Sequence, residues 1–294
     1  MAEKPRVSFY SEIARNKRNS VFLIIIVALV LVGLIYVIGL AIGADVFIIS
    51  ILAIIISLVY ILVSYYNSDK IAIASVNARP APYQEYRQYH NSVEGLSLAS
   101  GLPMPKLYIM NNPQINAFAS GRNPQNAVIC VTTGALEKLN KQELEGVLAH
   151  EMSHIANYDI KFMTLVAVMV GMIAIISEIF LRSLWFRGGN NREGKSGAIF
   201  MLIGIALAIL APILVSLVQL AVSRKREYTA DANAVKFMRT PTGLIGALTK
   251  IKSNSEMKVS GAVAPLFLAK PNKSVELFQT HPSLEKRIEV LRRM

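Results

Sequence analysis

The stretch Val147-Leu148-Ala149-His150-Glu151-Met152-Ser153-His154-Ile155 contains the pattern His-Glu-x-x-His inside a segment that is predicted to be helical. Two histidines four positions apart on an α-helix differ by about 40° of rotation and about 6 Å of rise, so both imidazoles leave one face. That geometry suits two corners of a tetrahedral Zn²⁺ site. Glu151 follows the first histidine closely enough to act as general base on a water held by the metal. The alternative is a solvated helix face that carries two histidines by chance.

The composition is typical of a membrane protein. The chain has 294 residues, of which 53% are hydrophobic, and its mean hydropathy is +0.43. This is too apolar for an ordinary soluble domain. The formal net charge of +12 lies mostly beside the apolar runs. We therefore expect membrane lipids with anionic headgroups, and no nucleic acid, as partners of the basic residues.

The single cysteine, Cys130, excludes a disulfide framework. It stands in the apolar run 127–131, which is predicted to be a strand, and no electropositive or histidine-bearing neighbour is evident in the sequence. We therefore expect a small buried residue and not a catalytic thiol.

Two uncharged runs near the N-terminus predict a transmembrane helical hairpin over residues 21–66. The runs 21–43 and 46–66 each have the length of about 20 apolar residues that crosses the hydrocarbon core. Residues 1–20 are polar and basic. The positive-inside rule therefore predicts a cytoplasmic N-terminus and a return of the chain to the cytoplasm near Tyr66.

Residues 162–222 predict a second membrane hairpin, built from the apolar runs 162–177 and 198–222. The loop between them falls on the side that the positive-inside rule leaves poor in basic residues. It nevertheless carries Arg182, Arg187, Arg192 and Lys195. A shallow or re-entrant hairpin therefore stays open as the alternative to two full spans.

The rest of the chain predicts a zincin-like metalloprotease domain in two parts, residues 67–161 and residues 223–294. The first part is expected to hold a helix followed by short strands, at 82–99, 106–110, 115–119 and 126–131. Asn140 as N-cap and Glu143 three residues later predict a capping box that starts the His-Glu-x-x-His helix. That helix is expected to end near residues 157–159, and the second part is mostly helical in pattern. The predicted fold class is a mainly α membrane protein with a small β-sheet and four hydrophobic membrane helices.

A catalytic zinc usually has three protein ligands and keeps one position for water, so a third ligand must come from elsewhere in the chain. Glu227 is the candidate, because the histidines lie just before the third apolar run and Glu227 lies just after the fourth. An antiparallel hairpin of those runs returns the chain to the same side of the membrane. Asp231, one helical turn beyond Glu227, suits a hydrogen bond to the second nitrogen of His150. The alternative is that both acids neutralise the basic residues 224–226 at a helix end.

Further residues have candidate roles in catalysis or substrate binding, each beside a structural alternative. His281 could stabilise an oxyanion or pack at the start of a helix. Arg287 could stabilise the same oxyanion, hold a substrate carboxylate, or lie on a solvated face. A strand before the zinc helix could bind an extended peptide along its edge or be a plain hairpin; its residues are Asn116, Ala117, Phe118 and Ala119.

At these positions the sequence resembles the HtpX family of membrane-bound zinc metalloproteases, which is related to the CAAX prenyl proteases and grouped with the gluzincins. The resemblance covers most of the chain. It is carried by residues 115–119, the His-Glu-Met-Ser-His core, Arg-Glu-Tyr-x-Ala-Asp at 226–231, and His281-Pro282. It implies one Zn²⁺ per chain, a base, an acid after the third ligand, and a histidine near the oxyanion. His150, His154 and Glu227 match the metal ligands, and Glu151 matches the base. Asp231 matches the acid after the third ligand, and His281 matches the histidine near the oxyanion.

The resemblance further implies a multi-pass endopeptidase of the cytoplasmic membrane, with a cytosolic active site, that degrades misfolded or damaged membrane proteins. One alternative is a prenyl-protein peptidase that cuts lipidated tails, although those proteins are generally longer and have more spans. The other is a non-catalytic membrane scaffold or chaperone that uses zinc only for structure, although no obvious fourth cysteine or histidine ligand stands near the motif.

Overall fold

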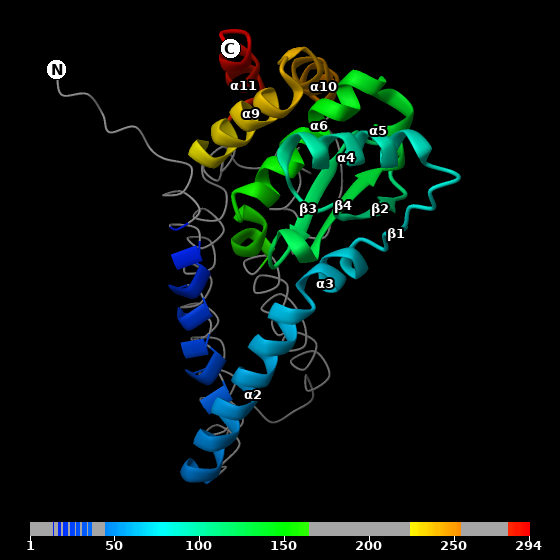
Figure 1. Cartoon of the computed structure of the whole chain (residues 1–294). Coiled ribbons are helices and arrows are strands. Elements are labelled where there is room, and N and C mark those ends of the chain that lie inside the picture. Colours follow the sequence, from blue (N-terminus) through cyan, green and yellow to red (C-terminus); the bar gives the residue numbers. More distant parts are fainter. Residues whose placement is uncertain are drawn as a thin grey trace, which may run out of the picture.

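The computed structural model describes residues 45–164, 224–253 and 282–294, together with scattered positions between 14 and 36. Figure 1 shows an apolar helix that leads into a domain of helices around a small sheet. In chain order the elements are α2 (Val46–Tyr66), α3 (Ser68–Ser75), β1 (Arg79–Pro80), α4 (Arg87–Ser100), β2 (Lys106–Met110), β3 (Ala117–Gly121), the 3₁₀ turn η1 (Pro124–Asn126), β4 (Ala127–Thr132), α5 (Thr133–Lys138), α6 (Lys141–Ala156), α9 (Arg224–Met238), α10 (Thr242–Ser253) and α11 (Leu284–Leu291).

Helix α2 confirms the predicted helix over residues 46–66. Asp45 caps its start, where the side chain accepts hydrogen bonds from the backbone N–H groups of Phe47 and Ile48, both at 3.0 Å. In the described part of the chain, α2 is the one helix long and apolar enough to cross a membrane. Only 17% of its most apolar window is buried, so it is not the core helix of a soluble domain. The first apolar run is described only in part, and the predicted second hairpin lies almost entirely outside the described residues.

The sheet is mixed and has the strand order β1-β2-β4-β3. Strand β4 runs parallel to β2 and antiparallel to β3, which forms the outer edge. The three strands predicted from the sequence are confirmed: β2 has the predicted bounds, whereas β3 begins two residues later and β4 one residue later than predicted. Together with the helices around it, this sheet confirms the predicted mainly α class with a small β-sheet.

Helix α4 begins at Arg87, five residues later than predicted. The segment before it closes a single turn, in which the N–H of Tyr86 donates to the carbonyl of Pro82 at 3.0 Å. The predicted end of the helix is confirmed, because Gly101 adopts a left-handed φ of 70° and caps it. His90, near its start, contacts the carbonyl of Ala81 at 2.8 Å, which is a structural role.

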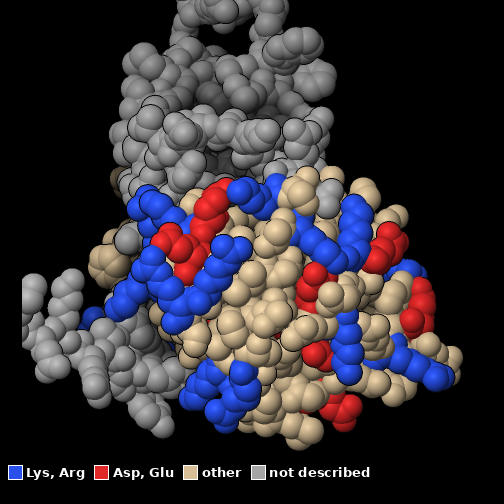
Figure 2. All heavy atoms as spheres, turned by 90° about the horizontal axis from the view of Figure 1, so that it is seen from above, with Lys and Arg blue, Asp and Glu red and all other residues tan. Residues whose placement is uncertain are grey.

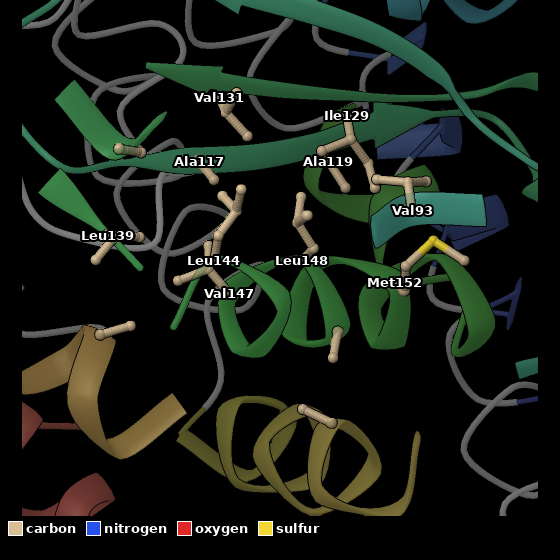
Figure 3. Packing of buried hydrophobic residues seen from close by; sticks show 14 of the residues in the cluster. Val93, Ala117, Ala119, Ile129, Val131, Leu139, Leu144, Val147, Leu148 and Met152 are labelled. Carbon is tan, nitrogen blue, oxygen red and sulfur yellow. The ribbon is translucent and has the colours of Figure 1, made fainter. Parts of the chain in front are cut away.

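Helix α6 lies against one face of the sheet and carries the His-Glu-x-x-His residues. Figure 3 shows its side chains Leu144, Val147, Leu148 and Met152 directed toward Ala117, Ala119, Ile129 and Val131 of the sheet. Helix α9 packs on α6 as well, so α6 lies between the sheet and α9. One buried cluster thus joins the segments before and after the second apolar region, and burial of this apolar area stabilises the domain.

The opposite face of the sheet packs against α3. Phe118, Val128 and Cys130 point to this side and contact Ala72 and Ile73. Because both faces are covered, every residue of β4 is buried. The prediction that Cys130 is a buried strand residue is confirmed, and burial raises the pKa of its thiol above its ordinary value.

The predicted capping box at the start of α6 is confirmed. The N–H of Glu143 donates to Asn140 Oδ1 at 2.9 Å, and the N–H of Asn140 donates to Glu143 Oε2 at 2.8 Å. The same carboxylate accepts from Lys250 Nζ of α10 at 2.7 Å. The cap therefore fixes both the start of the zinc helix and its contact with α10.

Helices α6 and α10 approach closely at a pair of glycines. A Cβ atom added to Gly146 of α6 would lie 2.7 Å from the carbonyl carbon of Gly243 and also meet Leu244. One added to Gly243 would meet the carbonyl of Gln142. These are backbone contacts, which cannot move aside as a flexible side chain would.

We predict that Gly146→Ala destabilises the protein by about 1–3 kcal/mol, because the methyl group forces the two helices apart. The matched control is Gly95→Ala in α4, where an added Cβ meets nothing within 4 Å. There alanine should leave stability unchanged or raise it by about 0.5–1 kcal/mol. Thermal unfolding of the detergent-purified chain measures both, and equal midpoints for the two variants would contradict the close packing.

Candidate metal centre

His150 and His154 come from successive turns of α6 and are both buried. Their Nε2 atoms lie 3.1 Å apart, and their rings are perpendicular with centroids 4.7 Å apart. The two nitrogens that face each other are therefore close enough to share one ion. The spacing of four residues places both imidazoles on one face of the helix.

Glu227 of α9 completes a group of three. Its two carboxylate oxygens lie 3.7 Å from His150 Nε2 and 3.7 Å from His154 Nε2. One ligand atom from each of the three residues falls within 4.8 Å of the others. Neighbouring ligand atoms of tetrahedral zinc are about 3.3 Å apart, so two imidazoles and one carboxylate in this arrangement fit the donor set of a catalytic zinc.

A small polar cluster holds α9 against α6 beside this site. Asn233 Nδ2 donates to Ser153 Oγ at 3.1 Å and to Asn157 Oδ1 at 3.3 Å. Ser153 and Asn157 are buried on α6 and at its C-cap. These bonds fix the relative position of the two helices and so place Glu227 opposite the histidines.

A carboxylate holds the second nitrogen of each histidine. His150 Nδ1 lies 2.9 Å from Asp231 Oδ1, the partner that the sequence predicted, and His154 Nδ1 lies 3.0 Å from Asp159 Oδ2. Such contacts fix the tautomer and turn Nε2 toward the shared point. All four side chains are buried, so the bonds are shielded from water.

Sequence reasoning missed Asp159, which it treated only as part of the helix end. The helix is interrupted at Asn157 and Tyr158, where Tyr158 adopts a left-handed φ of 59°, and Asp159 follows directly. This conformation is uncommon for a non-glycine residue. An acid five residues after the second histidine of the motif was the available signal.

Arg287 of α11 is fully buried against the acidic side of the centre. Its Nε and Nη2 donate to Asp231 at 2.9 and 2.6 Å, and its Nη1 lies 3.2 Å from Glu227 Oε2. The guanidinium therefore binds the third candidate ligand and the acid behind His150 together. The solvated-face alternative is wrong, and its oxyanion role stays a prediction. His281, the other residue predicted near the oxyanion, lies outside the described residues.

The buried charges shift one another. Burial and the charge of Arg287 lower the pKa of His150. For His154 burial acts in the same direction, but the hydrogen bond to Asp159 and the charge of Glu227 outweigh it and raise the pKa to about 9. Burial opposes ionisation of Asp231, yet Arg287 and His150 lower its pKa overall. The carboxylate of Asp231 is thus held ionised beside His150.

Glu151 points from α6 toward the edge of the sheet. Its carboxylate is buried and accepts a hydrogen bond from the backbone N–H of Ala119 in β3. Burial raises its pKa to about 7, with the charge of His154 opposing and that of Glu227 adding to the rise. A carboxyl group with this pKa can both take and give a proton near neutral pH.

The outer edge of β3 lies beside Glu151. Along this edge, the N–H of Ala117 donates to Asn116 Oδ1 at 3.0 Å, and the N–H of Gly121 lies 3.4 Å from Thr164 Oγ1. The inner edge pairs with β4, as at Phe118 and Cys130. The structure thus brings residues 116–119 to the metal centre, and their role in substrate binding stays a prediction.

The sequence profile of peptidase family M48 matches residues 83–294, which include every residue of this centre. The chain belongs to peptidase family M48. This M48 peptidase is 48% identical over 237 residues to the "Protease HtpX homolog" of Caldanaerobacter subterraneus subsp. tengcongensis, covering 78% of this chain and 79% of that one. It is 41% identical over 294 residues to the "Protease HtpX homolog" of Dictyoglomus turgidum, covering 98% and 95%. The resemblance to the HtpX family is confirmed.

The M48 peptidase also resembles the crystal structure of S. mikatae Ste24p, with a TM-score of 0.51 and 21% sequence identity. The match covers 89% of this chain and 61% of the Ste24p chain, so the present chain spans less than two thirds of that protein. At this identity the likeness shows a shared fold.

Family membership makes this chain a metalloendopeptidase and implies a bound metal, typically zinc. The residues present fit that ion, because three buried donors converge and carboxylates orient both imidazoles. His150, His154 and Glu227 are the residues that would hold it.

We predict that Asp159→Asn weakens zinc binding by about 10–100-fold, because the amide no longer fixes the orientation and basicity of His154. Competition with a chelator of known affinity measures the change. The control is Glu94→Gln, an exposed acid on α4 away from the centre. Equal zinc affinities for wild type and Asp159→Asn would show that the contact with Asp159 has no part in metal binding.

Proposed function

We propose that this chain is an integral membrane zinc endopeptidase that hydrolyses peptide bonds of misfolded or damaged membrane proteins at a cytosolic active site. The observation that carries the hydrolytic part is the placement of Glu151 between the three candidate ligands and the outer edge of β3, which pairs with no other strand among the described residues. A base, a metal position and a peptide-binding edge then meet at one point. Helix α2 supports the proposal of a membrane protein, because its apolar side chains are mostly exposed along its 21 residues.

The reaction follows from what the side chains around the centre can do. Zinc, when bound, polarises the attacking water and the scissile carbonyl. Glu151 takes the proton of the water and later passes it to the leaving amine. The substrate lies as an added strand along Asn116–Ala119, where main-chain hydrogen bonds hold it regardless of sequence. Broad recognition of this kind suits the removal of unfolded segments.

Arg287 and His281 are proposed on the oxyanion side of the substrate. A positive or hydrogen-bonding group there stabilises the charge that develops on the carbonyl oxygen. Arg287 already neutralises Asp231 and Glu227, so its first contribution is to hold the ligand framework. His281 lies outside the described residues and precedes, in the sequence, helix α11 with Arg287.

We predict that Glu151→Gln abolishes cleavage of casein, with a loss of at least about 10³-fold, while the protein still binds about one zinc. The amide cannot accept the proton, and it does not change the three ligands. Zinc-loaded, detergent-purified protein and its metal content test this. Glu145→Gln on the same helix is the control, and it should stay active and lose activity on chelation.

If wild type and Glu151→Gln both bind zinc and neither cleaves casein, other unfolded proteins or prenylated peptides, the zinc is structural and the scaffold alternative stands. Cleavage of the prenylated peptides alone would instead establish the prenyl-protein peptidase.

We predict that Arg287→Gln lowers zinc affinity by about 10–100-fold and destabilises the chain by about 3–5 kcal/mol, because Asp231 and Glu227 lose their buried counter-charge. Chelator competition and thermal unfolding measure the two effects, and Arg292→Gln, an exposed arginine at the end of α11, is the control. Unchanged zinc affinity with a reduced kcat would instead assign Arg287 to the oxyanion alone.

A further inference from the structure

Cations lie on aromatic rings at the junction where α2 enters the catalytic domain. Four such pairs occur among the described residues, and each uses either the end of α2 or the segment 158–162 that follows α6. The pairs and their distances are Lys17 over Tyr158 at 4.4 Å, Arg122 over Tyr66 at 5.0 Å, Lys161 over Tyr65 at 5.4 Å, and Arg226 over Phe162 at 4.8 Å.

Two of these pairs form a compact unit at the end of α2. The rings of Tyr65 and Tyr66 are edge to face with centroids 5.3 Å apart, and one carries Lys161 while the other carries Arg122. Arg122 Nη1 also donates to the carbonyl of Tyr66 at 2.8 Å. Both cations thus lie at the level where the apolar helix ends. Tyrosine is enriched at that level of a membrane protein, beside the lipid headgroups.

Arg122 and Lys161 contrast with the basic residues of α10 and α11 that pair with acids. Within the described ranges, neither Arg122 nor Lys161 has a carboxylate within ion-pair distance. On α10 and α11, by contrast, basic side chains pair with acids, as in Lys250–Glu143 at 2.7 Å, Lys252–Glu285 at 3.0 Å and Arg293–Glu289. Figure 2 shows that face from above, with blue and red side chains intermixed. The positive charge at the end of α2 is therefore left for an anion from outside the chain.

We propose that Arg122 and Lys161, on the platform of Tyr65 and Tyr66, bind the headgroup of an anionic phospholipid; this rests on the proposed span of α2 across the bilayer. A guanidinium has five N–H donors in a planar fork that matches a phosphate, and the bond to Tyr66 uses one of them. The lysine adds a second charge from the other side of the tyrosine pair. A lipid phosphate at the helix end reaches both cations from within the interface.

The site joins the membrane to the two segments that border the metal centre. Arg122 directly follows β3, whose outer edge lies beside Glu151. Lys161 stands two residues after Asp159, which holds His154. A bound headgroup therefore restrains the edge strand and the turn after the zinc helix together.

The test is binding of short-chain phosphatidylglycerol to the full chain in an uncharged detergent, read as the rise in its thermal unfolding midpoint during titration. Phosphatidylcholine of the same chain length and inorganic phosphate are titrated in parallel. Each cation should strengthen lipid binding about fivefold, so the double variant Arg122→Gln/Lys161→Gln should bind phosphatidylglycerol roughly 25-fold more weakly. The exchange variant Arg122→Lys/Lys161→Arg keeps the charge and should keep most of the shift.

The matched control is Lys236→Gln/Arg292→Gln, which removes the same charge from exposed positions on α9 and after α11. It should bind phosphatidylglycerol as the wild type does. An equal loss of binding in both double variants would show that only the net charge of the protein matters. An equal rise in the unfolding midpoint with phosphatidylcholine or inorganic phosphate would show that the site does not select an anionic lipid. Either result overturns the proposal. The measurement reads no catalysis, so its outcome is independent of whether the chain cleaves protein.

Discussion

The metal centre depends on two carboxylate–imidazole hydrogen bonds. Two histidines on successive helical turns have mobile rings, and their nitrogens converge only when something fixes the far side of each ring. Asp231 does this for His150 from α9, and Asp159 does it for His154 from the turn after α6. Both contacts are buried, so water does not compete with them. The remaining features of the domain hold these two acids in place.

The buried charged side chains at the metal centre come from different helices and pair with one another. Three acids face the two histidines, and Arg287 lies against two of these acids, Glu227 and Asp231. Burying any one of these charges alone would cost several kcal/mol, whereas the hydrogen-bonded group offsets most of that cost. Because α11 contributes the arginine, the last helix of the chain is as much a part of the centre as the His-Glu-x-x-His helix. The three candidate ligands, two imidazoles and one carboxylate, are a donor set suited to a divalent cation.

Strand β3 of the sheet connects the metal centre with the end of α2. Strand β3 is at the edge, so one row of its backbone groups faces Glu151 and not another strand. At its far end the chain turns to Arg122, which binds the last carbonyl of α2. A single strand therefore runs from the end of α2 to Glu151, the proposed base. The distance between the end of α2 and the metal centre is set by rigid secondary structure, which positions groups more accurately than loops do.

Features that depend on local periodicity and capping follow from the sequence alone. These include the shared face of His150 and His154, the capping box at Asn140, the apolar helix α2 and the three main strands. The sequence also pointed to Glu227, because chain topology limits the choices, and to the contact of Asp231 with His150, because Asp231 lies one helical turn beyond Glu227. The contacts of Asp159 with His154 and of Arg287 with Glu227 and Asp231, and the close approach of α10 to Gly146, appear only in the folded structure. These contacts depend on a left-handed turn and on the packing of helices that are distant in the sequence. Neither produces a periodic pattern of residues from which it could be predicted.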